Sequence, residues 1–211
     1  MGVYENNINA CNEINAKQLL MKLDEKIDKI FNSKLNVKNI IKAITECVIP
    51  TYTYIFSHEF SDEDRSQLAR NVDIRIRSYM NTKDMKLSSI SNARCYLPRK
   101  QLGLGLRSTE VEMDKDTIKN FIHIIFSPYL KFAITHDANH RNKWRIKAMI
   151  TANKYGINLQ TNSENIKIII NNKEYNSFNL KEVKYKIKEL VNEFSDKSWE
   201  AHYKKRKHFL K

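Results

Sequence analysis

Cysteine is scarce in this sequence, and the three that occur, Cys11, Cys47 and Cys95, are odd in number and far apart. They form no C-x-x-C pair, so the pattern indicates neither a disulfide framework nor a zinc site. Such cysteine usage is typical of a reducing compartment, the cytosol or the nucleus, and we expect a cytoplasmic protein.

Long apolar runs are also missing. A helix that spans a membrane needs about 20 consecutive apolar residues, and no segment approaches that length. The first residues lack the basic and apolar regions of a signal peptide. Asn6 stands where the myristoylation pattern requires Ser or Thr. We therefore expect no membrane partner.

Positive charge, in contrast, is abundant: 37 Lys and Arg against 24 Asp and Glu give a formal net charge of +13. Such an excess favours a polyanionic partner, most often nucleic acid. The abundance of Lys, Ile and Asn, expected from AT-rich codons, explains part of the lysine excess. It explains the arginines less well, and seven of these fall in one segment: Arg65, Arg70, Arg75, Arg77, Arg94, Arg99 and Arg107.

The spacing of apolar residues predicts a mainly α-helical protein. Pro50 is expected to bend or end the second helix, and Gly156 to end the fifth. Ser61 opens a predicted capping box, and Ser108 or Thr109 is predicted to cap the helix that follows it. The predicted helices cover residues 12–31, 37–50, 61–80, 109–126, 142–155 and 180–194.

One small β-hairpin is predicted near residues 166–175, where an Ile-rich run is followed by Asn171 and Asn172. The change of character before it predicts a helical domain over 1–156. A second domain over 157–211 would hold the hairpin, the last helix and a basic tail. One continuous domain is the alternative.

The segment from Arg94 to Leu106 stands out because it holds one of the three prolines and two of the four glycines. A Tyr-x-Pro-Arg sequence that runs into Gly103-x-Gly105 predicts a fixed backbone platform for basic side chains. The Gly-x-Gly pair does not indicate a nucleotide site, because no strand–loop–helix context surrounds it.

The order of these landmarks resembles the thumb and post-thumb region of non-LTR retrotransposon reverse transcriptases. There, a Tyr-x-Pro-Arg-x-x-Gly-Gly-x-Gly-Leu segment follows a long helix. Leu102 replaces the first of those glycines, Leu104 stands where Arg is frequent, and Phe209 follows His208 in place of Gly. The resemblance implies a thumb-like helical fold that holds a nucleic-acid duplex by its backbone.

No Asp-Asp pair occurs in the sequence. Polymerases need such carboxylates for two-metal phosphoryl transfer, so we expect a chain that is not an enzyme and that uses no cofactor. His136 and His140 have the i, i+4 spacing of a metalloprotease helix, with Asp137 in place of Glu. We expect a polar surface there and no metal site, because no third ligand has suitable spacing.

The candidate nucleic-acid-binding residues lie on the platform, on the helix before it, directly after His140 and in the basic tail. Trp199 and Tyr203 beside the tail suit stacking on RNA bases. The alternatives are a structural turn with solvated charges, and a frayed chain end. The candidates are Arg75, Arg77, Arg94, Tyr96, Arg99, Lys100, Arg107, Arg141, Lys143, Lys204, Lys205, Arg206 and Lys207.

These observations predict a non-catalytic RNA-binding protein on a large ribonucleoprotein, first of all the ribosome, as an inhibitory or dormancy factor. Its partners would be rRNA and ribosomal proteins, and the start at Met1 favours a stand-alone factor. The alternative is a thumb fragment or subunit of a reverse transcriptase, in the nucleus, with the palm supplied elsewhere. A metalloprotease is the third class.

Overall fold

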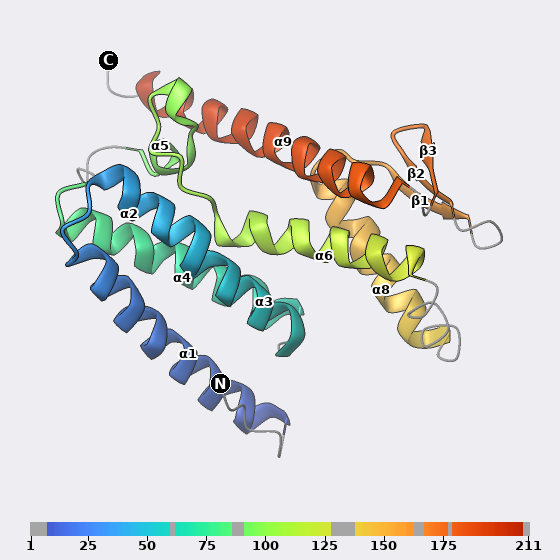
Figure 1. Ribbon diagram of the computed structural model, residues 1–211, viewed down its shortest axis with the longest axis horizontal. Coiled ribbons are helices and arrows are strands. Elements are labelled where there is room, and N and C mark those ends of the chain that lie inside the picture. The colour runs from blue at the N-terminus through green and yellow to red at the C-terminus, as the bar shows by residue number, and fades with distance from the viewer. Residues whose placement is uncertain are drawn as a thin grey trace. The chain divides into compact units, whose positions relative to one another are not determined.

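The computed structural model in Figure 1 describes residues 8–59, 62–85, 91–127, 138–162, 167–176 and 179–208. The predicted fold class is confirmed: the protein is mainly helical, with one small antiparallel sheet. In the part of the chain described here, no helix is long and apolar enough to cross a membrane. The elements are α1 (Ile8–Phe31), α2 (Val37–Ala43), η1 (Ile44–Val48), α3 (Ile49–Glu59), α4 (Asp62–Thr82), α5 (Ala93–Tyr96), η2 (Arg99–Gln101), α6 (Thr109–Phe126), α8 (Ala138–Lys154), β1 (Leu159–Asn162), β2 (Lys167–Ile170), β3 (Lys173–Tyr175) and α9 (Leu180–His208).

The chain forms two compact units. Unit 1 comprises Met1–Met113 and Ser198–Lys211, and unit 2 comprises Asp114–Lys197. Two long helices, α6 and α9, each begin in one unit and end in the other. The boundary that the sequence suggested at residue 156 falls inside unit 2, because the helix before that residue and the sheet after it belong to the same unit.

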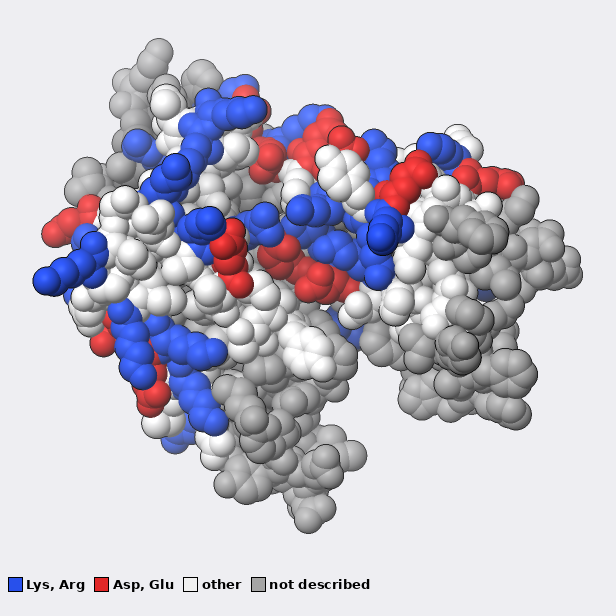
Figure 2. Space-filling view, viewed as in Figure 1, with Lys and Arg blue, Asp and Glu red and all other residues white. Residues whose placement is uncertain are grey.

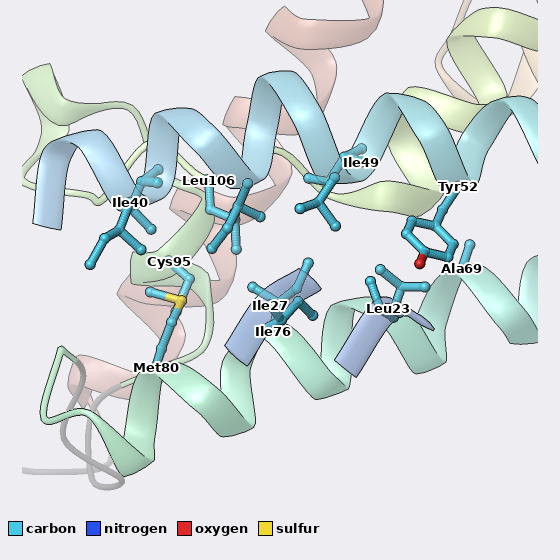
Figure 3. Close-up of a cluster of buried hydrophobic side chains, with 14 of the residues drawn as sticks. Leu23, Ile27, Ile40, Ile49, Tyr52, Ala69, Ile76, Met80, Cys95 and Leu106 are labelled. Carbon is cyan, nitrogen blue, oxygen red and sulfur yellow. The ribbon is translucent and has the colours of Figure 1, made fainter. Parts of the chain in front are cut away.

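The core of unit 1 is built from helical stripes with a spacing of four residues. The apolar residues whose spacing predicted a helix over 61–80 are buried on one face of α4, and α1 carries a matching face. Figure 3 shows side chains of α1, of α4 and of the α2–α3 segment pointing toward one another. The buried stripes are Leu19, Leu23, Ile27 and Phe31 on α1, and Leu68, Val72, Ile76 and Met80 on α4.

The sequence predicted that Pro50 bends or ends its helix, and the structure shows that it does not end there. The chain passes through the π-helical turn η1, and α3 then continues to Glu59. The N–H of Ile49 donates to the carbonyl of Ile44, five residues back. In such a π turn an N–H pairs with the carbonyl five residues back instead of four, and the helical segment continues past Pro50. Proline is tolerated near the start of a helix, because its missing N–H is not needed there.

The sheet of unit 2 has the order β1–β2–β3, and both pairs are antiparallel. The predicted hairpin is confirmed as β2 and β3, joined by Asn171 and Asn172 with φ of 48° and 69°. Positive φ at both positions is what a two-residue turn requires, and asparagine accepts it more readily than most residues. Strand β1 was not predicted, because Leu159–Asn162 is short and mostly polar.

Helix α9 is longer than the sequence suggested. Its apolar periodicity ends near Phe194, but the helix continues to His208, so the basic run 202–208 belongs to it and is no separate tail. Good helix-forming residues and i, i+4 ion pairs support the extension. Two such pairs are Lys197 with Glu193 at 2.7 Å and Lys204 with Glu200 at 2.6 Å.

Two positions of α1 test the packing of unit 1. Leu23 is fully buried and Met21 is 59% exposed. Leu23→Ala should lower the free energy of unfolding by about 3 kcal/mol, because it leaves a cavity among α1, α3 and α4. The matched change Met21→Ala should cost less than about 0.5 kcal/mol. Urea unfolding followed by circular dichroism measures both, and equal costs would contradict this packing.

Candidate nucleic-acid interface

The segment 93–107, called the basic loop below, folds back on itself. The N–H groups of Leu104 and Leu106 donate to the carbonyls of Arg94 and Cys95, each at 2.9 Å. The N–H of Gly105 donates to the carbonyl of Leu97 at 3.0 Å. The last carbonyls of a helix need partners from outside that helix, and here residues 104–106 supply them to α5. The backbone is therefore fixed, as the sequence predicted.

Two glycines make this fold-back possible for different reasons. A Cβ on Gly103 would lie 1.9 Å from the carbonyl oxygen of Leu97, so no side chain fits there. Gly105 has φ of +72°, a left-handed conformation that costs other residues free energy. Close approach explains the first glycine and backbone conformation explains the second.

Leu102 has an unusual conformation at the end of the short helix η2, with φ of 61° and ψ of 20°. The N–H of Leu102 donates to the carbonyl of Arg99, and the N–H of Gly103 donates to the carbonyl of Pro98. These two bonds form the Schellman motif, in which glycine is the usual left-handed residue. A leucine therefore occupies the position that glycine would occupy with less strain.

Four basic side chains of the loop are exposed to solvent, and one of them, Arg107, lies near a carboxylate. The other three are Arg94, Arg99 and Lys100. Arg94 Nε donates to the carbonyl of Leu102 at 3.3 Å, and Arg99 Nη2 lies 3.5 Å from the carbonyl of Lys38. Among the described residues, no carboxylate forms an ion pair with any of the three. The sequence also has no acidic residue from 85 to 109. A polyanion can therefore meet these cations without displacing a carboxylate of the described residues.

Other predicted contact residues are used inside unit 1. Arg75 forms an ion pair with Asp24. Arg107 lies 3.7 Å from a carboxylate oxygen of Glu112. Arg75 is only partly exposed and Arg107 is exposed, but a carboxylate neutralises part of the charge of each before any ligand arrives. They contribute less to a binding surface than the three exposed cations that have no carboxylate partner.

Tyr96 is placed differently from the predicted contact role. Its ring is buried and stacks on Trp199, with centroids 4.6 Å apart and an interplanar angle of 20°. Its hydroxyl accepts a hydrogen bond from Arg77, whose guanidinium lies 5.7 Å from the ring centroid. Because the ring is packed in this way, it does not stack on a base in this structure. Tyr96, Arg77 and Trp199 hold the basic loop against the end of α9.

Burial also acts on the protonation of Tyr96. Desolvation raises the pKa of its hydroxyl far above the ordinary value, and the charge of Asp73 acts in the same direction. The charge of Arg77 and its hydrogen bond lower that pKa by less. The hydroxyl therefore stays neutral at physiological pH and accepts the hydrogen bond of Arg77.

Asp73 of α4 fixes the exit of the basic loop. Its carboxylate accepts hydrogen bonds from the Ser108 hydroxyl at 2.7 Å and from the N–H of Thr109 at 2.8 Å. Ser108 precedes α6, so a carboxylate from a distant helix satisfies part of this helix start. Burial raises the pKa of Asp73, while these hydrogen bonds and the charge of Arg77 partly offset that rise.

The remaining predicted contacts lie away from the basic loop in sequence. Lys204 and Lys205 are exposed on the last turns of α9. The side chains of Arg206 and Lys207 lie outside the described residues. The same holds for the side chains of Arg141 and Lys143 in α8. Ser61 of the predicted capping box, His136 and Asp137 and the side chain of His140 also lie outside the described residues. No metal-binding group occurs among the residues that are described.

Charge density alone does not select one site. Figure 2 shows Lys and Arg side chains spread over the visible face and mixed with Asp and Glu in several places. The basic loop differs by its lack of acidic neighbours in sequence and by its hydrogen-bonded backbone. Sequence reasoning found this loop but missed Asp73 and the left-handed backbone of Leu102. The leucine that replaces a glycine of the resembled motif was the signal that could have pointed to this backbone.

Comparison of this chain with models of protein families, with curated proteins and with solved structures finds no match. The resemblance to a reverse transcriptase thumb therefore stays a prediction.

The close approach at Gly103 can be tested inside the loop. Gly103→Ala should lower the free energy of unfolding by roughly 2–4 kcal/mol, because the new methyl group overlaps the Leu97 carbonyl. Gly105→Ala is the matched control. Its Cβ would meet only the Arg99 side chain, with Cγ at an ordinary 3.6 Å and Nε at 3.9 Å. It should cost about 1 kcal/mol, from the left-handed φ alone. Thermal unfolding that ranks Gly105→Ala as the costlier change would contradict this geometry.

The raised pKa of Asp73 predicts a pH dependence. The folded protein holds this proton more tightly than the unfolded chain does. Stability from Asp73 is therefore complete below the ordinary pKa of 3.8 and is lost as pH rises through the higher folded value. Asp73→Asn removes this titration. In urea unfolding, the stability of the wild type relative to Asp73→Asn should fall as pH rises above 3.8. A relative stability that rises instead would show that the pKa is lowered.

Proposed function

We propose that this chain is a non-catalytic RNA-binding protein that contacts the phosphate backbone of a structured RNA through its basic loop. The observation that carries this proposal is the set of three exposed cations on a hydrogen-bonded backbone. Arg94, Arg99 and Lys100 lie within seven consecutive residues, and among the described residues none of the three forms an ion pair with a carboxylate.

Electrostatic attraction favours contact between these cations and RNA phosphates. A cation that meets a phosphate releases condensed counterions, so affinity rises with each contact and falls steeply with salt. Cations already paired with carboxylates gain less, because the internal pair must be given up. A fixed backbone also lowers the ordering cost of binding, since little main-chain freedom remains to be lost. Such binding positions a protein on RNA and carries little sequence information.

A large ribonucleoprotein fits this kind of binding because it presents continuous phosphate surfaces. The net charge of +13 supports a polyanionic partner of that size. The ribosome is the first particle to test, since it is abundant and offers both rRNA and ribosomal proteins as contacts. A bound protein of 25.0 kDa could occlude a functional site of the particle, which would make it an inhibitory or dormancy factor.

A reverse transcriptase thumb is the second candidate, and one observation favours it. The hydrogen-bonded loop follows the arginine-bearing helix α4, in the order that the resemblance implies. The same cations would then contact a template–primer duplex. A marked preference for an RNA–DNA hybrid over ribosomes would favour this second function.

The proposal is tested by co-sedimentation with ribosomes in sucrose gradients over a range of salt concentrations. The loop variant replaces Arg94, Arg99 and Lys100 by Gln. The matched control replaces Lys181, Lys184 and Lys188 of α9, in unit 2, by Gln and removes the same charge. The loop variant should reduce the slope of log affinity against log salt by about 2 to 3, since each lost phosphate contact contributes about 0.7 to 0.9.

The control variant should change this slope by less than about one contact's worth. Equal losses in both variants would mean that net charge, and not the basic loop, drives binding. Absence of the wild-type protein from ribosomal fractions at low and moderate salt would contradict the ribosomal assignment.

A further inference from the structure

We propose that Leu102 is an RNA-contacting residue whose apolar side chain packs against an unstacked base beside the phosphates held by the basic loop. This inference rests on the proposed function and adds the class of RNA. The preferred ligand would carry a bulge or an open loop, because an uninterrupted A-form duplex offers no base face to a side chain.

The first observation is exposure. The basic loop contains four leucines, and three of them face the protein. Leu97 and Leu106 are buried, and Leu104 packs partly against the core of unit 1. Leu102 is 81% exposed, the highest value among the large apolar side chains that are exposed in the described residues. The fold therefore does not use this side chain for packing.

The second observation is strain. Leu102 has a left-handed backbone, which costs an L-residue with a Cβ roughly 1–2 kcal/mol. Glycine would avoid this cost, and the neighbouring Gly103 shows that the loop does use glycine where space demands it. No burial of the leucine compensates for the strain. An uncompensated outlier of this kind points to a function for the side chain.

The third observation is the chemistry around the leucine. Arg94 donates to the carbonyl of Leu102, and the exposed Arg99 and Lys100 precede it by three and two residues. An apolar tip flanked by cations matches a ligand in which an apolar ring lies beside phosphates. Nucleic acid has this pattern, and apolar side chains, leucine among them, are used as wedges between bases in architectural proteins. An RNA base is therefore the assigned contact.

The test uses two synthetic RNA hairpins of equal length and charge, one with a bulge of unpaired bases and one fully paired. Fluorescence anisotropy gives the affinity of the wild type, Leu102→Gly and Leu102→Met for each. The wild type should prefer the bulged hairpin. Leu102→Gly should bind it roughly tenfold more weakly, because burial of an aliphatic side chain is lost. Leu102→Met should retain most of the preference.

The salt dependence separates this contact from the phosphate contacts. Leu102→Gly should leave the slope of log affinity against log salt unchanged, whereas Arg99→Gln should lower it by nearly one contact. Leu102→Gly should also unfold at no lower a temperature than the wild type, since glycine suits a left-handed position. A weaker affinity therefore cannot be assigned to misfolding.

The outcomes are distinguishable. Equal affinity of the wild type and Leu102→Gly for the bulged hairpin would overturn the role of Leu102 and leave RNA binding by the loop intact. Failure of the wild type to bind either hairpin or ribosomes would overturn the proposed function and this inference together. Binding to anionic lipid vesicles that Leu102→Gly abolishes, with RNA affinity unchanged, would assign the leucine to a membrane surface instead.

Discussion

The contact between Gly103 and the carbonyl of Leu97 is the constraint on which the basic loop depends. Because no side chain stands between them, residues 104–106 can return to α5 and donate three hydrogen bonds, two to carbonyls of α5 and one to the carbonyl of Leu97. A side chain at position 103 would push the backbone there away from Leu97. The arginines of the loop would then lose their fixed positions, and their charges would become those of an ordinary solvated segment.

The rest of unit 1 holds this loop at both ends. At its start, the Tyr96 hydroxyl accepts a hydrogen bond from Arg77 of α4, and the Tyr96 ring stacks on Trp199 of α9. At its exit, Asp73 of α4 accepts hydrogen bonds from Ser108 and from the N–H of Thr109. Helix α4 thus anchors both ends, and the buried stripe that it shares with α1 keeps α4 itself in place. The packing of the unit 1 core therefore also fixes the position of the charged side chains of the basic loop.

The sequence predicted features that depend on neighbours along the chain. The apolar stripe of α4 and the turn at Asn171 and Asn172 were found because their signals are local. The extension of α9 was not predicted, because the apolar periodicity ends near Phe194 and the contact of Trp199 with Tyr96 joins residues far apart in sequence. The internal partners of the arginines were hidden for the same reason: Arg75 pairs with a residue 51 positions away. The left-handed backbone of Leu102 was not predicted either, because it depends on how the basic loop folds.

The most direct test of the central claim, that the basic loop is the RNA-binding surface, is photo-crosslinking. Wild-type protein bound to ribosomes would be irradiated, digested and analysed by mass spectrometry for peptides that carry RNA. Crosslinked peptides should come from residues 93–107, with the neighbouring α2 around Lys38 as the next site. Crosslinks confined to residues 114–197, with none in the basic loop, would contradict the account.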